Sequence, residues 1–198
     1  MYKKRLGSKA IAAACGLGLA ASLLGAASPV IAEEIKGTSG STEVQVRADT
    51  SNMKFRVPTV IRFAANADGT LTTPSDEAAN IENLSVFSIH VTGMKVKAGE
   101  SWNIVADKQA AANASTENNI AFSVGPDGAP QNAADAMSGE GIDLSANSAF
   151  NMTYQDGADD TLELLSAGSV AKVDGKQLTG EGAKVATITW TLAPGNAS

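Results

Sequence analysis

The 198-residue chain has little of what most enzyme and metal sites use. It contains one cysteine and one histidine, and only 5% of its residues are aromatic. A single Cys excludes a disulfide framework or a thiolate metal cluster within the chain, and a single His excludes a site with several histidine ligands. We therefore expect no metal site, and a fold held by core burial alone.

Positive charge is also scarce. The chain has 15 Lys and Arg against 21 Asp and Glu, which gives a formal net charge of -6 and a pI near 4.8. Proteins that bind nucleic acid present basic stripes that neutralise the phosphate backbone. The charge balance therefore predicts no nucleic-acid partner.

The first 32 residues are typical of a secretory signal peptide. Four basic residues within the first nine precede a small-residue apolar stretch at 10–24, and Val30 and Ala32 occupy the -3 and -1 positions of a cleavage site. The stretch is interrupted by glycines and falls at or below the roughly 20 apolar residues that span a bilayer. Cys15 lies inside this stretch rather than at its end, which disfavours lipidation. We expect export, cleavage after Ala32 and no membrane contact afterwards.

The remaining chain divides into a leader and one domain. Residues 33–41 are rich in Gly and Ser and predict a flexible leader, and residues 42–198 predict a single domain. Residues 192–198 contain no sortase-type motif, so we expect any attachment to a cell wall to be non-covalent.

Short segments of period-two alternation, separated by Gly, Asn and Asp turns, fill residues 42–198. Such spacing predicts an all-β fold, an antiparallel β-sandwich or barrel-like domain with long loops. Asn66-Ala67-Asp68-Gly69, between the 59–64 and 70–72 segments, predicts a hairpin turn, because Asp-Gly tolerates a positive φ. Residues 106–115 and 133–137 are predicted as short helices or as loops. The predicted strands are 42–48, 53–57, 59–64, 70–72, 86–96, 102–105, 119–124, 150–154, 161–165 and 185–192. The predicted core is Val44, Val46, Phe55, Val57, Ile61, Phe63, Phe87, Ile89, Val91, Phe122, Ile188 and Leu192.

Both tryptophans begin a Trp-x-aliphatic triplet on a predicted strand. The triplets are Trp102-Asn103-Ile104 and Trp190-Thr191-Leu192. Residues two apart on a strand share a face, so each triplet places a large ring beside a branched side chain. These pairs are either part of the core of the domain or, for one or both rings, an exposed platform on which a sugar ring stacks.

The stretch at 184–194 resembles the distal motif of the WxL domain, a cell-wall-binding domain of Gram-positive surface proteins. Residues 101–105 resemble its proximal motif more loosely, with Ile104 where the family has Leu, and residues 57–63 resemble its opening strand. The resemblance implies a β-rich domain that attaches non-covalently to peptidoglycan, often with other exported surface proteins. It carries over Trp102, Ile104, Trp190 and Leu192 as motif residues that bind the ligand.

Two other features suggest chemistry only weakly. His90 has no second His and no Cys nearby, and it shares a predicted solvent-side face with Ser88 and Thr92. The acidic segment at 156–163 lacks the regular spacing of a calcium loop and predicts a solvated turn. No catalytic residue and no cofactor are predicted.

The sequence thus predicts a secreted, non-enzymatic protein of the cell surface that binds Gram-positive peptidoglycan. The alternative is a structural or assembly subunit of a surface or matrix complex, acting through protein contacts at exposed sheet edges. A secreted hydrolase or a soluble sugar-binding module is the third interpretation.

Overall fold

The computed structural model describes residues 46, 49–73, 79–178 and 182–197. Every described residue belongs to one compact unit, which begins at residue 46. The predicted signal peptide, its cleavage site, the leader and most of the 42–48 strand lie outside the described residues. Among the described helices, none has the length and apolar character needed to cross a membrane.

The fold is all-β and barrel-like, with antiparallel sheets, as the sequence predicts. The larger sheet is organised around β11 (Thr161–Ala171). One side of β11 pairs with β7 (Asn119–Gly125), and the other pairs first with β4 (Ala79–Asn83) and then with β3 (Thr70–Thr72). With 11 residues, β11 is long enough to pair with all three strands, and it therefore joins β7 to β4 and β3 within one sheet.

Four two-residue strands extend the larger sheet. β1 (Phe55–Arg56) pairs with β4, and β2 (Ala64–Ala65) pairs with β3. β6 (Asn103–Ile104) pairs in parallel with β7, and β8 (Gln131–Asn132) pairs with β7 antiparallel.

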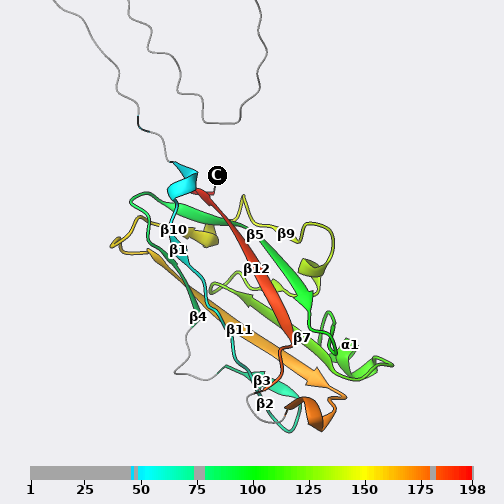
Figure 1. The fold of residues 1–198 in the computed structure, drawn as a ribbon. Helices are drawn as coiled ribbons and strands as arrows, with labels where there is room; N and C mark the ends of the chain where they lie inside the picture. Colours follow the sequence, from blue (N-terminus) through cyan, green and yellow to red (C-terminus); the bar gives the residue numbers. More distant parts are fainter. Residues whose placement is uncertain (1–45, 47–48, 74–78, 179–181, 198) are drawn as a thin grey trace, which may run out of the picture. The chain divides into compact units, whose positions relative to one another are not determined.

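The smaller sheet is organised around β5 (Ile89–Ala98). One edge of β5 pairs along nearly its whole length with β12 (Ala186–Pro194), and the other edge pairs with the short strands β9 (Ile142–Asp143) and β10 (Asn151–Met152). In Figure 1, β5 and β12 lie in front of β7 and β11. The core cluster draws side chains from both sheets, so the two sheets enclose one hydrophobic core.

Helical structure is limited to short connections. The helix α1 (Lys108–Asn113) lies within the predicted 106–115 segment, and the Asp107 side chain caps it by accepting a hydrogen bond from the Ala110 N–H. Four short 3-10 helices complete the connections. They are η1 (Thr50–Asn52), η2 (Asp135–Met137), η3 (Ser148–Phe150) and η4 (Gly175–Leu178).

Several predicted core residues are buried as expected. Ile89, Val91 and Phe122 are buried, and the predicted residues at 61, 63, 87, 188 and 192 are partly buried against the same cluster. The Phe63 and Phe122 rings pack with their centroids 6.0 Å apart. The hairpin predicted around residues 66–69 is present, with Gly69 at a positive φ of 80° in its turn.

Three predicted core residues are wrong. Val46 is 93% exposed, and Phe55 and Val57 are each 38% exposed. The alternation at 53–57 is real, but it yields only the two-residue edge strand β1, which pairs with β4 alone. A side chain at such an edge has few neighbours to cover it, and Val44 lies outside the described residues.

A β-bulge in β5 changes the phase of its side chains. Thr191 of β12 pairs with Gly93, whereas the next residue, Leu192, pairs with Val91, so Thr92 is an extra residue in β5. The inward positions therefore shift from odd numbers before the bulge to even numbers after it, where Met94 and Val96 are buried. This shift turns the later odd-numbered residues of β5 outward.

Candidate functional site

The two tryptophan triplets lie in different sheets but contribute to one core. Trp102 immediately precedes β6 and is 5% exposed, and Ile104 on β6 packs against the same cluster. The Trp102 Nε1 is buried and has no hydrogen-bond partner within the described part of the chain. In this arrangement the Trp102 ring is a core residue and cannot serve as an exposed stacking platform.

Trp190 and Leu192 occupy the inward side of β12. Both are partly buried against the core cluster, in alternation with the exposed residues Thr187, Thr189 and Thr191. The packing expected of a Trp-x-aliphatic triplet is thus present in both copies. Of the four motif residues, none lies fully exposed, and Trp190, Ile104 and Leu192 retain part of their surface.

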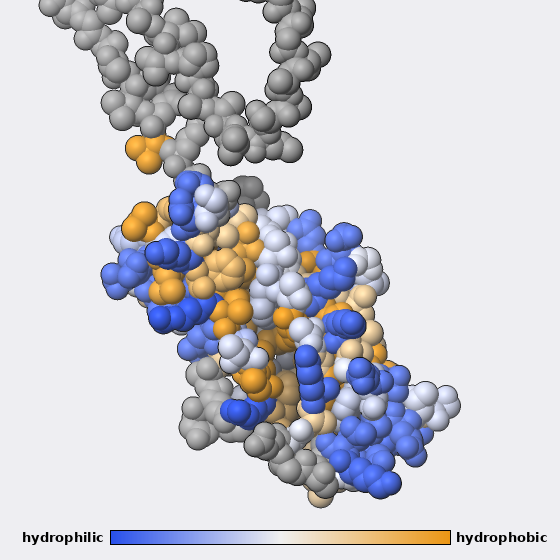
Figure 2. All heavy atoms as spheres, in the orientation of Figure 1, coloured by the Kyte–Doolittle hydropathy of each residue, from blue (hydrophilic) through white to orange (hydrophobic). Residues whose placement is uncertain are grey.

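The exposed side of the smaller sheet carries a regular polar array. Thr187 pairs with Lys97, Thr189 with Lys95, and Thr191 with Gly93. Directly opposite residues of an antiparallel pair have Cβ atoms about 4.5–5.5 Å apart, so these side chains form one continuous surface. We call Thr187, Thr189, Thr191, Lys95 and Lys97 the Thr-Lys face. In Figure 2 the surface over β5 and β12 shows near-white residues with orange residues among them and blue side chains beside them.

The Thr-Lys face is not among the sites that the sequence predicts. Its signal is present as Thr-x-Thr-x-Thr at 187–191 and Lys-x-Lys at 95–97, which are period-two patterns of polar side chains. The tryptophan motif instead indicates the inward side of the same strand. The bulge in β5, which sets Lys95 and Lys97 on the outer side, is marked in the sequence by a change of phase, because the apolar positions are odd at Ile89 and Val91 but even at Met94 and Val96.

His90 is more enclosed than the sequence suggested. Its side chain was expected on a solvent-side face, but it is 8% exposed, and its ring Nδ1 lies 2.8 Å from the carbonyl oxygen of Gly195. Two residues further along the chain end, the Ala197 N–H donates to the side chain of Asn151, which pairs with His90 across the sheet. His90 therefore helps to hold the chain end that follows β12.

The acidic segment forms a hydrogen-bonded loop between β10 and β11. Asp156 has a positive φ of 63°, and its N–H donates to the Asp160 carboxylate, which also accepts from the Thr161 hydroxyl. Across the described residues, no three His, Cys, Asp or Glu side chains gather closely enough to hold a metal ion. The geometry gives this loop a role as a turn.

One carboxylate beside the Thr-Lys face has a perturbed acidity. Asp143 of β9 pairs with Gly93 of β5. The Ser145 hydroxyl and the Ser145 N–H both donate to its carboxylate, and these two bonds lower the pKa of Asp143 below its ordinary value. Asp143 is therefore ionised at neutral pH and tied to its own turn.

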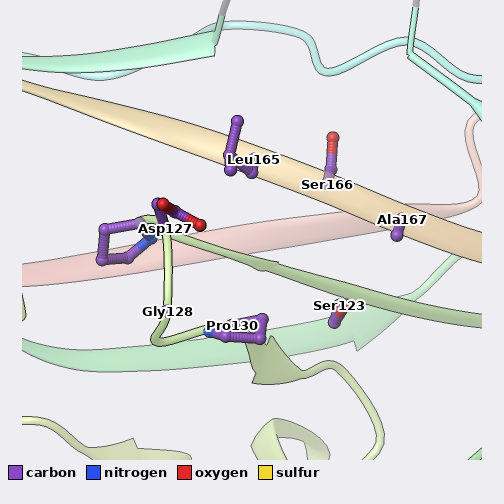
Figure 3. A pocket seen from close by; sticks show the side chains of 8 residues that line it. Ser123, Asp127, Gly128, Pro130, Leu165, Ser166 and Ala167 are labelled. Carbon is purple, nitrogen blue, oxygen red and sulfur yellow. The ribbon is translucent and has the colours of Figure 1, made fainter.

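A small hollow lies on the larger sheet, at the turn between β7 and β8. It has a volume of about 230 Å³, and its walls include Asp127, Pro130 and Leu165 (Figure 3). Ligand pockets usually measure roughly 300–1,000 Å³ and enclose most of the ligand. Asp127 is the single ionisable side chain among its lining residues, so this hollow has no second group for acid–base chemistry.

Comparison with known protein families, characterised proteins and solved structures finds no match to this chain. The candidate site is therefore defined by its own geometry, which places an exposed polar face on the outer side of the strand that carries the distal tryptophan motif.

Proposed function

We propose that this protein is an exported, non-enzymatic surface protein that attaches non-covalently to the Gram-positive cell wall. The observation that carries the proposal is the Thr-Lys face. Three hydroxyls and two ammonium groups lie exposed in two parallel rows on adjacent strands. Such rows of hydrogen-bond donors on an exposed sheet fit an extended polymer better than a small substrate, which requires a concave site.

The resemblance to WxL domains supports the same function, with a revised role for its motif residues. The core positions of Trp102 and Ile104 suit a structural role, in which the triplet fixes β6 beside β7. Trp190 and Leu192 anchor the inward side of β12, and this packing presents the three threonines outward. In this proposal the motif supports the binding face and peptidoglycan contacts the opposite side of the strand.

The test is co-sedimentation with purified Gram-positive sacculi. The protein is produced from the full-length gene in a Gram-positive host, and the parent is compared with Thr187→Val/Thr189→Val, which keeps the branched shape and removes two hydroxyls. The matched control is Thr161→Val, an exposed threonine on β11 in the other sheet. We expect the parent to sediment with sacculi, the double variant to bind more weakly, and the control to bind like the parent. A folded parent that stays in the supernatant refutes wall attachment.

A second function, assembly into a larger surface complex, is favoured by the open edge of β12. Within the described residues β12 pairs only with β5, so its other edge has no strand beside it. Natural edge strands are usually guarded by charges or proline, but β12 has no charged residue and its only proline is the last residue, Pro194. Such an edge can accept an added strand from another protein or another copy.

The hydrogen-bond register supplies a matched pair of variants for this second function. The Gly99 N–H donates to the Val185 carbonyl, so Val185 is a residue that hydrogen-bonds to β5. In an antiparallel pair every second residue makes such bonds, so Thr187 also bonds to β5 and the N–H of Ala186, between them, points to the open edge. We expect Ala186→Pro to fold and to reduce any concentration-dependent assembly in sedimentation velocity. Thr187→Pro should instead remove a bond to β5 and lower stability. A parent that stays monomeric at all concentrations argues against this function.

A further inference from the structure

The two lysines of the Thr-Lys face have no ionic partner. Lys95 and Lys97 are exposed, and neither forms an ion pair with any described residue. Their positions two residues apart on β5 place their Cα atoms roughly 6.6–6.8 Å apart on the same side of the strand. Opposite them stand Thr189 and Thr187, whose hydroxyls are exposed donors.

The outer side of the larger sheet has the opposite character. There the register brings Glu163 opposite Asn80 and Glu82 opposite Thr161. Of these two carboxylates, Glu82 pairs with Arg56 at 2.8 Å, and Glu163 is exposed. The outer side of the smaller sheet thus carries two ammonium groups without an ion pair and one carboxylate, Asp143, whereas the larger sheet carries the Glu163 carboxylate and the Glu82–Arg56 ion pair. The two sheets therefore differ in the sign of the charge that they expose.

We infer that the Thr-Lys face binds the linear phosphodiester polymer of the Gram-positive wall. This inference rests on the proposed wall attachment and names its ligand. Lysine ammonium groups bind phosphate as point charges, and hydroxyl side chains donate to phosphate oxygens. Two lysines two residues apart along an extended strand meet successive charges of an extended polyanion, and the threonine row lies parallel to them.

This ligand also resolves an electrostatic difficulty of the proposed function. The full chain has a net charge of -6, and removal of the predicted signal peptide with its four basic residues makes the exported protein more negative still, so an anionic wall repels it. Charges farther apart than about 8 Å are largely screened at physiological ionic strength, so the local sign at the contact decides the interaction. The Thr-Lys face has two ammonium groups against one adjacent carboxylate, Asp143, which is held by Ser145, so its local charge is positive, and the glutamates of β4 and β11 belong to the other sheet.

The experiment compares intact sacculi with sacculi from which hydrofluoric acid has removed the phosphodiester polymer. The protein is the full-length gene product, tested as the parent, as Lys95→Gln/Lys97→Gln and as Lys54→Gln/Lys108→Gln. The last variant removes the same charge from residues outside β5 and β12 and serves as the control. Thermal unfolding of each variant confirms that all three proteins are folded.

We expect binding to intact sacculi to fall roughly tenfold when the polymer is removed, and by a similar factor in Lys95→Gln/Lys97→Gln. The control variant should bind like the parent. Two neutralised charges also predict a log–log salt slope near -1.4, which is about a fivefold loss of affinity for a threefold rise in salt.

The outcomes separate this inference from the proposed function. Equal binding of the parent to stripped and intact sacculi overturns the phosphodiester ligand and leaves wall attachment in place. A parent that binds neither form overturns wall attachment itself. Equal binding of purified wall polymer and single-stranded DNA in solution also overturns the inference, because the face would then recognise any polyanion.

Discussion

Asn83 provides the sharpest test of how this fold is held together. It is fully buried at the end of β4, and its side chain joins three backbone groups. Its Nδ2 donates to the carbonyls of Phe87 and Thr153, at 2.8 and 2.6 Å, and its Oδ1 accepts from the Ser85 N–H at 2.8 Å. One amide therefore fixes the turn after β4 to the loop that follows β10.

Replacing Asn83 with alanine removes all three bonds at once. Each such bond contributes about 1 kcal/mol net, and the buried carbonyls and N–H left behind lose their partners as well. We expect Asn83→Ala to lower the free energy of unfolding by about 3–5 kcal/mol. The control is Asn80→Ala on the same strand, where the side chain is exposed and the expected change is within about 0.5 kcal/mol.

The assay is urea unfolding followed by tryptophan fluorescence, which reports on the core through Trp102. The variant Asn83→Asp adds a test of sign. Its carboxylate would face two carbonyl oxygens, so folding raises the pKa of the introduced carboxyl group. The protonated acid is therefore the form that the folded state tolerates, and the variant loses stability as pH rises through the folded-state pKa. A loss below about 1 kcal/mol for Asn83→Ala, or one equal to that of Asn80→Ala, would refute this account of the interaction.

Three further predictions concern other parts of the fold. Gly128→Ala should lower the free energy of unfolding by about 1 kcal/mol, because Gly128 has a positive φ and open space around it. Gly69→Ala should lower it by about 1–3 kcal/mol more, because the new Cβ would also collide with the Val170 carbonyl oxygen, and urea unfolding compares the two variants. Trp102→Ala should lower stability by about 3–5 kcal/mol and Trp102→Phe by clearly less, since Phe keeps much of the packing and removes an unpaired buried N–H; similar losses would contradict this. Because folding lowers the pKa of Asp143, its contribution is present at neutral pH and disappears as pH falls through the folded-state pKa, so unfolding curves of Asp143→Asn and the parent should converge in acid.

Local alternation was enough to locate many of the strands. The predicted 119–124 and 185–192 segments differ from β7 and β12 by at most two residues at either end, and the 66–69 turn lies where Asp-Gly indicated it. These segments combine β-branched or aromatic residues with turn residues at their ends, so the local pattern and the tertiary structure agree.

The strands that the sequence missed or shortened depend on distant partners. β4 reads Ala-Asn-Ile-Glu-Asn, a polar segment that becomes a strand between β1 and β11. The predicted 161–165 strand continues to Ala171 because β7 and β3 pair with its second half, which contains Gly168. A Cβ at Gly168 would meet the Ala121 carbonyl oxygen at 2.6 Å, so the residue that weakens the local strand signal is the one that the close pairing requires.

The candidate site shows the same division. The sequence identified β12 and the two tryptophan triplets, and it indicated that each Trp shares a face with its aliphatic neighbour. A single alternation continued through residues 86–96 misses Lys95 and Lys97, because one extra residue at Thr92 reverses which side of β5 faces outward. The apolar positions of β5 do change phase between Val91 and Met94, but the sequence does not identify the strand that pairs with β5 there.

The sequence by itself determined the all-β class, the position of the hairpin and the alternation that buries one side of β12. Those properties follow from short-range side-chain chemistry, since period-two alternation and turn residues act within a few positions. Only the tertiary structure decided that Trp102 is enclosed, that Asn83 joins two loops, and that threonines and lysines from strands about 90 residues apart share one face. Alternation defines two sides of a strand, but long-range pairing decides which side is covered and what lies beside it.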